Sequence, residues 1–441
     1  MNRTRGWLRR VFVDRTLRAH WPSWLMLGAA TVIVLAARHV AQDLIAHGAD
    51  LRLDEPPLHA ALDWRPNWRL VLPIGIGVVA TAAAPALARR MAWSVLLVGL
   101  AALSAAWAVA LALLDGVSGL VGSVARNTEY FPDVGKVGSP GSFLHGFVTH
   151  INDYNLHVTG HPPGFLLFLW GVDRLGFGTV GVVAALEIAA GALAVPAVLI
   201  AVRDVAGETS ARATAPFVAV SPLAIWVATS ADAFFMGVSA WAVALVILAT
   251  GRTGRRAVVY GSAGGLLFAF AAFLSYGLVL LAAVPFTVAW SRRRFWPLVA
   301  AGCAAAAVFA AAALAGFWWF DGLAATHDIY YAGVASRRPY LEFLLVNAAC
   351  LLIVLGPAVV VALGRLRDRR TWLLVGGALA TIGLAALSGM SKGEVERIWL
   401  PFFIWVLPAA AVLGIGRRRA PWLAAQVAYT IVLQTLIRSP W

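Results

Sequence analysis

The chain has 441 residues, of which 61% are hydrophobic and 13% are charged, and its mean hydropathy is +0.80. Soluble domains are about half apolar and about a quarter charged, so this composition excludes a soluble globular enzyme, a disordered chain and a fibrous repeat. The net charge is +14, but the arginines that carry it form small clusters between apolar runs. Such clusters indicate membrane topology, and no nucleic-acid partner is expected.

Apolar stretches of about 20 residues recur along the chain, which predicts an all-α polytopic integral membrane protein. Arginines crowd residues 1–20 and place this segment in the cytoplasm. One run, 162–176, is short and interrupted by Asp173 and Arg174, so we expect a re-entrant or interfacial helix there. The thirteen expected spans of the plasma membrane are 21–41, 70–88, 92–114, 179–202, 214–229, 232–250, 257–275, 277–291, 296–320, 341–364, 371–389, 399–416 and 421–437.

This topology divides the chain into three regions. They are a basic cytoplasmic N-terminus (1–20), a transmembrane module (21–250) with outer loops at 42–69 and 115–161, and a C-terminal helical bundle (251–441). The C-terminus then lies outside, and most inter-helix arginines face the cytoplasm. Because most carboxylates and histidines face the other side, we expect binding or chemistry on the extracytoplasmic face.

The longest outer loop, 115–161, carries the candidate catalytic carboxylates. Asp115 opens it at the end of a helix, and Glu129 follows within the loop. Apolar residues recur at helical spacing near 117–124 and 143–151, which predicts two amphipathic helices along the membrane. Because long ordered loops are usually functional, we expect this one to hold part of a site, with a structural plug as the alternative.

Further polar residues stand at the ends of expected spans, where a charge is costly unless it is solvated or paired. Asp232 lies in a tight outer turn, and the segment 391–399 places four charges between two apolar helices. Structural ion pairs and a binding site are both compatible with these groups. The candidate substrate-binding residues are Asp153, His157, His161, Asp232, His327, Arg337, Arg338, Tyr340, Lys392, Glu394, Glu396 and Arg397.

These residue types suit the transfer of a sugar from a lipid-linked phosphate. Asp115, or Glu129 as its competitor, would accept the proton of the acceptor hydroxyl as general base. Arginine and lysine side chains at the level of the lipid headgroups would stabilise the leaving phosphate, a role that a divalent metal also performs. No other cofactor is expected.

Two motifs resemble a known family. The segment His161-Pro162-Pro163-Gly164, followed by Phe165-Leu166-Leu167, is similar to the His/Tyr-Pro-Pro-Leu segment of the GT-C superfamily of membrane glycosyltransferases. The Ser221-Pro222 helix that runs to Asp232 is similar as well, and the resemblance covers roughly 92–250. It implies a polyprenyl-phosphate sugar donor and an extracytoplasmic glycan, lipid or protein acceptor, as in actinobacterial cell-wall assembly. In that family the acidic residue usually follows the first helix, whereas Asp115 follows the third.

The alternative function is a transporter or flippase for a lipid or small solute. Such proteins carry ionisable residues inside their spans and are often built from repeats. Glu187 is the acid well inside an expected span, and the sequence contains no evident internal repeat. The polar residues gather at one face instead of the membrane midplane, which favours an enzyme.

Overall fold

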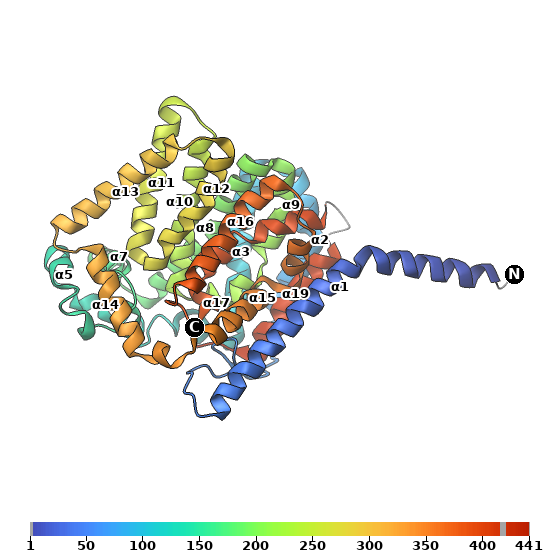
Figure 1. The fold of residues 1–441 in the computed structure, drawn as a ribbon, viewed down its shortest axis with the longest axis horizontal. Helices are drawn as coiled ribbons and strands as arrows, with labels where there is room; N and C mark the ends of the chain where they lie inside the picture. Colours follow the sequence, from blue (N-terminus) through green and yellow to red (C-terminus); the bar gives the residue numbers. More distant parts are fainter. Residues whose placement is uncertain (1–2, 415–419, 441) are drawn as a thin grey trace.

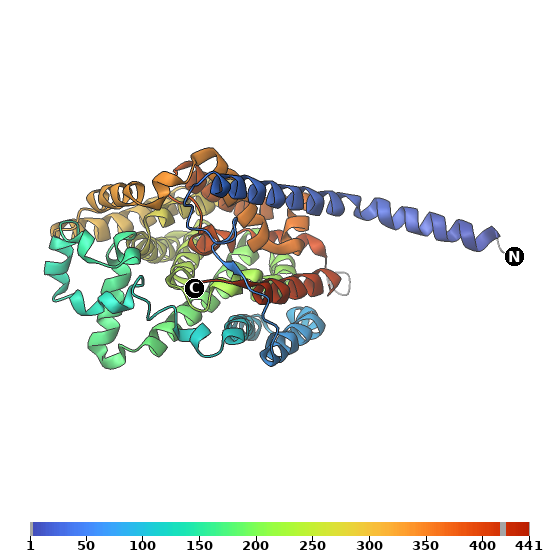
Figure 2. The same cartoon turned by 90° about the horizontal axis from the view of Figure 1, so that it is seen from below.

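The computed structural model describes residues 3–414 and 420–440, and most of this part of the chain is helical. The long helices pack side by side in one bundle, from which the N-terminal part of α1 projects (Figures 1 and 2). The principal helices are α1 (Arg3–Ala46), α2 (Val71–Arg90), α3 (Trp93–Ala112), α8 (Val180–Ala206), α9 (Glu208–Ala219), α10 (Ala231–Thr250), α11 (Gly254–Leu274), α12 (Ala283–Arg292), α13 (Trp296–Leu314), α14 (Trp319–Ala332), α15 (Tyr340–Arg365), α16 (Arg369–Leu387) and α19 (Ala420–Leu436). A short antiparallel ribbon pairs β1 (Ala61–Leu62) with β2 (Ile437–Arg438), which ties the loop after α1 to the end of the described chain.

Nine helices among the described residues are long and apolar enough to cross a membrane, so the chain is a multi-pass helical membrane protein. They coincide with nine of the thirteen expected spans. The nine are Pro22–Ala46, Trp68–Arg90, Trp93–Asp115, Val180–Ala206, Ala231–Thr250, Gly254–Leu274, Trp296–Leu314, Tyr340–Arg365 and Arg369–Leu387. The other four expected spans, 214–229, 277–291, 399–416 and 421–437, correspond to shorter or interrupted helices, so the expected number is not confirmed.

Local breaks explain two of the interrupted elements and the short helix in the run 162–176. Helix α9 ends at Ala219 because Pro222 lacks an amide hydrogen and holds the residue before it in an extended conformation. Ser275 is extended between α11 and the 3₁₀ segment Tyr276–Ala282, which precedes α12. The run 162–176 folds as the nine-residue helix α7 (Gly164–Val172), followed by a wide turn, Asp173–Phe177.

The connection between α3 and α8 is ordered, but it does not form the two amphipathic helices expected from its periodicity. Glycines and Pro140 divide it into short turns, because glycine is a weak helix former and proline cannot continue a helix. Its buried face is nevertheless the expected one, since Phe143, Phe147 and Ile151 are all buried. The turns are α4 (Ser118–Val121), a 3₁₀ turn (Phe131–Lys136), α5 (Pro140–Gly146), a second 3₁₀ turn (Ile151–Asp153) and α6 (Leu156–Thr159).

The arginine-bearing turns meet at one end of the bundle. Asp204 pairs with Arg252 at 3.1 Å and with Arg292 at 2.9 Å, so three of these turns are joined by ion pairs. Arg212 donates to the carbonyl of Met91 at 3.1 Å and joins a fourth. Several arginines of these turns remain exposed: Arg89, Arg90, Arg255, Arg256, Arg293, Arg367, Arg369 and Arg370. The loops after α1 and α3 and the turn after α16 lie at the opposite end, where the candidate site is found.

Candidate functional site

The charged residues of the segment 391–397 lie in a tight turn after α16 and in the short helix α17 (Val395–Ile398) that follows it. Gly393 and Glu394 both have left-handed backbone conformations, with φ of +84° and +61°. A β-carbon at position 393 would lie 3.0 Å from Nη1 of Arg338, so a side chain there would press on that guanidinium group. The amide of Gly393 donates to Oδ1 of Asn347 on α15 at 3.1 Å, which holds the turn in place.

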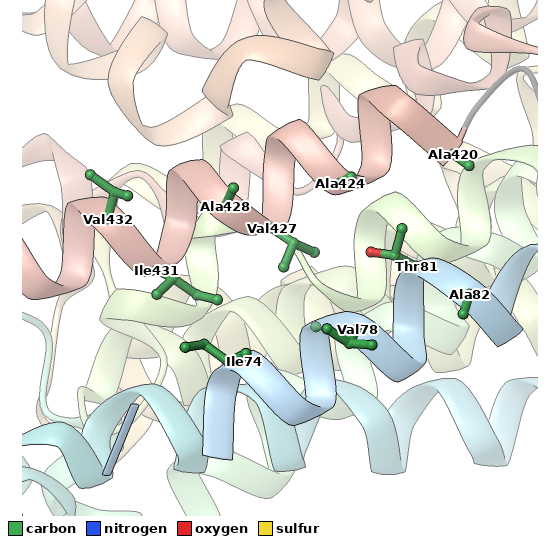
Figure 3. Close-up of a pocket in the computed structure, with 11 residues that line it drawn as sticks. Ile74, Val78, Thr81, Ala82, Ala420, Ala424, Val427, Ala428, Ile431 and Val432 are labelled. Carbon is green, nitrogen blue, oxygen red and sulfur yellow. The ribbon is translucent and has the colours of Figure 1, made fainter. Parts of the chain in front are cut away.

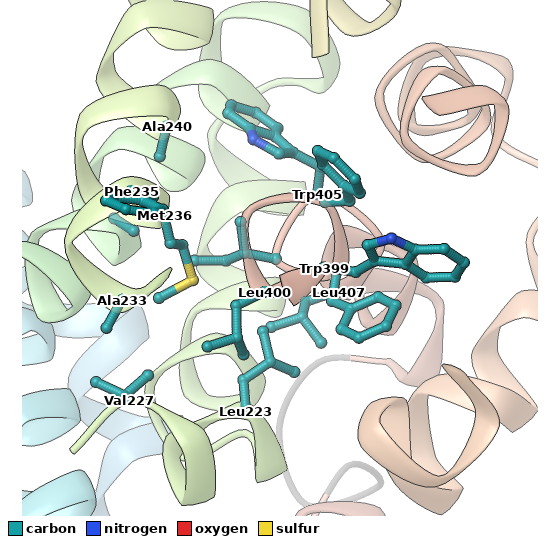
Figure 4. Packing of buried hydrophobic residues seen from close by; sticks show 14 of the residues in the cluster. Leu223, Val227, Ala233, Phe235, Met236, Ala240, Trp399, Leu400, Trp405 and Leu407 are labelled. Atoms are coloured by element: carbon teal, nitrogen blue, oxygen red, sulfur yellow. The ribbon is translucent and has the colours of Figure 1, made fainter. Parts of the chain in front are cut away.

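Arg397 and Asp232 form an ion pair at the centre of the site, with side chains that are only 4% and 2% exposed. Asp232 lies in the first turn of α10, where the positive end of the helix favours a carboxylate. Burial opposes the charge of Arg397, but the surrounding carboxylates outweigh it and raise the pKa. The chain after Arg397 packs onto α10, and Figure 4 shows Leu400 and Met236 in the same cluster of buried hydrophobic side chains. This apolar packing keeps the ion pair away from water.

His157 on α6 links Arg397 to the connection between α3 and α8. Its Nδ1 lies 2.9 Å from Oε2 of Glu129, and its Nε2 lies 3.4 Å from Nη2 of Arg397. The amide of His157 also donates to the carbonyl of Thr128 at 3.0 Å, which aligns the two segments. Burial raises the pKa of Glu129, but the hydrogen bond with His157 and the charge of Arg397 outweigh burial and lower it overall. Glu129 is therefore ionised at neutral pH and orients the imidazole ring.

Aromatic and acidic side chains enclose this cluster. The ring of Tyr130 lies 6.1 Å from that of His157 and 5.8 Å from that of His161, measured between centroids. Burial lowers the pKa of His161 to about 4, so its ring is neutral near pH 7. Glu187 on α8 is buried and interacts electrostatically with Arg397. Within the described part of the chain, Oε2 of Glu187 and the hydroxyl of Tyr130 have no hydrogen-bond partner.

A cavity of about 280 Å³ lies beside these groups. Its polar wall is formed by His157, His161, Arg338, Glu394 and Arg397, and Arg338 pairs with Glu394 at 3.2 Å. Apolar side chains line much of the remainder: Leu156, Leu278, Leu280, Ile329, Ile398 and Phe402. The cavity therefore suits a substrate that has both an anionic and a hydrophobic part.

The structure brings eight of the predicted site residues together. Five line the cavity, Glu129 and Asp232 contact its polar wall, and Nζ of Lys392 donates to the carbonyl of Arg338 at 3.0 Å. Four others make separate contacts, contrary to the expectation of one shared site: Asp153 with His150 (3.3 Å), His327 with Asp328 (3.2 Å), Arg337 with Asp50 (3.2 Å), and the hydroxyl of Tyr340 with the carbonyl of Leu387 (2.9 Å).

Asp115, the first-choice base, lies apart from the cavity. It forms an ion pair with Arg65 and lines a different, smaller pocket. Asn67 donates to the carbonyl of Leu114 at 3.2 Å and holds the same loop against the end of α3. The expectation that Asp115 shares a site with Arg338 and Arg397 is therefore corrected, and its position is that of a residue that anchors the loop after α1.

Glu396 lies behind the cavity and is fully buried. Its Oε1 accepts the amide of His59 at 2.8 Å, and its Oε2 accepts the Sγ–H of Cys350 at 3.5 Å. Burial raises the pKa of Glu396 from an ordinary value of 4.5 to about 7, so the folded protein binds this proton more tightly than the unfolded chain does.

We expect this carboxyl group to make the free energy of unfolding depend on pH. The contribution of Glu396 should be complete below about pH 4.5 and should fall by about 3 kcal/mol as the pH rises to about 7. Unfolding midpoints measured in detergent at about pH 5 and about pH 8 would test this. Glu396→Gln should reduce the difference between the two midpoints, and an identical pH dependence in both proteins would contradict the prediction.

Four polar residues of the site were not among the candidates expected from the sequence. Tyr276, Thr326 and Tyr330 line the cavity, and Tyr130 packs against its histidines. The hydroxyl of Tyr330 accepts the amide of Lys392 at 2.7 Å. The one available signal was Ser275-Tyr276, a polar pair inside an otherwise apolar stretch.

The wall of the cavity combines an imidazole group, that of His157, with the guanidinium groups of Arg338 and Arg397, which suit a phosphate. No group of three or more His, Cys, Asp or Glu side chains within residues 3–414 and 420–440 is arranged to hold a metal ion. Comparisons with protein-family models, curated proteins and solved structures found no match.

Proposed function

We propose that the chain is a membrane glycosyltransferase, which moves a sugar from a polyprenyl-phosphate donor to an extracytoplasmic glycan, lipid or protein acceptor. The observation that carries the proposal is the buried series Glu129–His157–Arg397–Asp232 beside a largely apolar cavity. In this proposal, His157 is the proton acceptor and Arg397 is the neighbouring group that binds phosphate. Sugar transfer from a lipid phosphate requires both at one point.

In this proposal, the acceptor hydroxyl attacks the anomeric carbon of the sugar while Nε2 of His157 takes its proton. The carboxylate of Glu129 accepts a hydrogen bond from Nδ1–H of His157 and stabilises the imidazolium that forms, as in other pairs of histidine and carboxylate. The bond between the anomeric carbon and the phosphate oxygen breaks, and the polyprenyl phosphate leaves with the bonding electrons. Arg397 and Arg338 stabilise the charge of that phosphate. The base is then His157 with Glu129, in place of Asp115.

Two carboxylate variants test this assignment. Purified protein in proteoliposomes would receive a radiolabelled polyprenyl-phosphate sugar and a lipid-extract acceptor, and the transferred label would be measured. Glu129→Gln should lower the rate by about 100-fold or more, because a neutral amide no longer stabilises the imidazolium. Asp115→Asn should stay within about threefold of the parent rate, because this residue lies outside the cavity.

Both variants should elute from size-exclusion chromatography like the parent protein, which controls for folding. Loss of transfer in Asp115→Asn with full activity in Glu129→Gln would reverse the assignment. Failure of the parent protein to transfer label from any polyprenyl-phosphate sugar would remove the support for the enzyme.

A transporter is the second candidate, and Glu187 is the observation that favours it. This carboxyl group lies within a span, is 4% exposed and stands close to a charged cluster. Buried acids within spans often take part in proton-coupled transport. Uptake of a labelled lipid phosphate or small solute into vesicles, driven by a pH gradient and lost in Glu187→Gln, would support this candidate over the enzyme.

A further inference from the structure

A groove separate from the cavity lies between α2 and α19. Its volume is about 670 Å³, and apart from Thr81 its lining is apolar, as Figure 3 shows. Small residues create the space: Ala424 and Ala428 on α19 face it, and Gly77 on α2 lets the two helices approach closely. The groove therefore follows two helices through the apolar part of the bundle.

A polar pocket of about 170 Å³ lies beyond one end of this groove. The groove reaches Val432 on α19, and the pocket is lined by Arg438 six residues later, roughly 10–15 Å along the chain. Arg126 also lines the pocket, and both arginines are exposed. Asp115, which lines the pocket too, is paired with Arg65, so guanidinium groups outnumber carboxylates around it.

We infer that the groove and the pocket together bind one lipid with a phosphate headgroup. The hydrocarbon chain lies along α2 and α19, and the phosphate lies between Arg126 and Arg438. Guanidinium groups suit phosphate because their planar donors bind two of its oxygens at once. The guanidinium group of Arg438 lies 3.9 Å from the carboxylate of Asp63, and this long contact is compatible with a second anionic partner.

The apolar lining of the groove favours a lipid as its occupant. An extended peptide would bring backbone amides and carbonyls into an apolar groove that offers them no hydrogen-bond partners, whereas a hydrocarbon chain has no such groups. Free phosphate would occupy the polar pocket but would leave the groove unfilled. The site shares no lining residue with the cavity beside Arg397, so the inference does not depend on the proposed function.

Native mass spectrometry of the full chain in detergent tests the inference, with dioleoyl phosphatidic acid and dioleoyl phosphatidylcholine as probes. We expect phosphatidic acid to be retained at least about tenfold more strongly. Removing the charges with Arg126→Gln and Arg438→Gln, or filling the groove with Ala424→Phe and Ala428→Phe, should each lower this retention about tenfold or more.

Matched control variants carry the same kinds of substitution at positions away from the groove and the pocket. Arg255→Gln with Arg256→Gln removes two exposed arginines at the opposite end, and Val98→Phe enlarges an exposed apolar residue on α3. Both should lower retention much less than the changes at the site, because neither position adjoins the groove that holds the hydrocarbon chain. Equal retention of the two lipids would overturn the inference, as would loss of binding in the control variants. Competition by inorganic phosphate combined with full binding in the groove-filled variant would assign the pocket to free phosphate instead.

Discussion

Replacing Arg397 with methionine should lower the free energy of unfolding by about 3–5 kcal/mol, the cost expected when one partner of a buried ion pair is removed. The carboxylate of Asp232 would remain 2% exposed, without its guanidinium partner, in an apolar environment. Unfolding in detergent, followed by circular dichroism with increasing denaturant, would measure the change. This is the largest stability effect that we expect from a single substitution in the site.

The double variant Asp232→Leu with Arg397→Met should recover much of the lost stability, because it removes both charges together. Arg337→Met is the matched control, since Arg337 forms an exposed ion pair with Asp50. It should change the free energy of unfolding by less than about 1 kcal/mol. If Arg337→Met and Arg397→Met lowered the free energy of unfolding equally, burial of the ion pair between Arg397 and Asp232 would not contribute to stability.

Replacing His157 with asparagine should reduce sugar transfer by about 100- to 10,000-fold if the proposed function is correct, because asparagine cannot accept the proton of the acceptor hydroxyl. The effect should appear in kcat rather than in KM, since the imidazole acts in the transition state. Initial rates of label transfer in proteoliposomes, measured over a range of donor concentrations, would separate the two parameters.

His150→Asn is the control for this experiment, because His150 is exposed and pairs with Asp153 away from the cavity. It should leave kcat unchanged within about twofold. A His157→Asn variant that elutes as a folded protein and retains more than about a third of the parent rate would rule out His157 as the base.

The sequence predicted the long spans well because their signal is local. Runs such as 92–114 and 371–389 have the length and apolarity that a bilayer demands, and the structure has helices there. Two of the expected spans, 214–229 and 277–291, are interrupted in the structure, because apolar composition continues across a helix break. At Pro222 and Ser275 the chain stays buried while its helical hydrogen bonds stop, and hydropathy does not report that change.

The composition of the site could be predicted only in part, for a different reason. Residues 391–397 were recognisable because four charges between apolar helices require partners. The choice of partners depends on tertiary contacts, and the sequence could not show that Glu129 reaches His157 while Asp115 turns to Arg65. Tyr130 and Thr326 carry no charge, so no local pattern distinguished them from other polar residues near membrane ends.

The arginine-bearing turns have a consequence for how deep the protein sits in its bilayer. Exposed guanidinium groups such as those of Arg255, Arg256 and Arg370 are attracted to anionic headgroups, by about 1 kcal/mol for each basic side chain close to the surface. Because three of these turns are joined by ion pairs to Asp204, the attraction is shared among the helices that they connect. Membranes richer in acidic phospholipids should therefore hold the protein at a more constant depth and tilt.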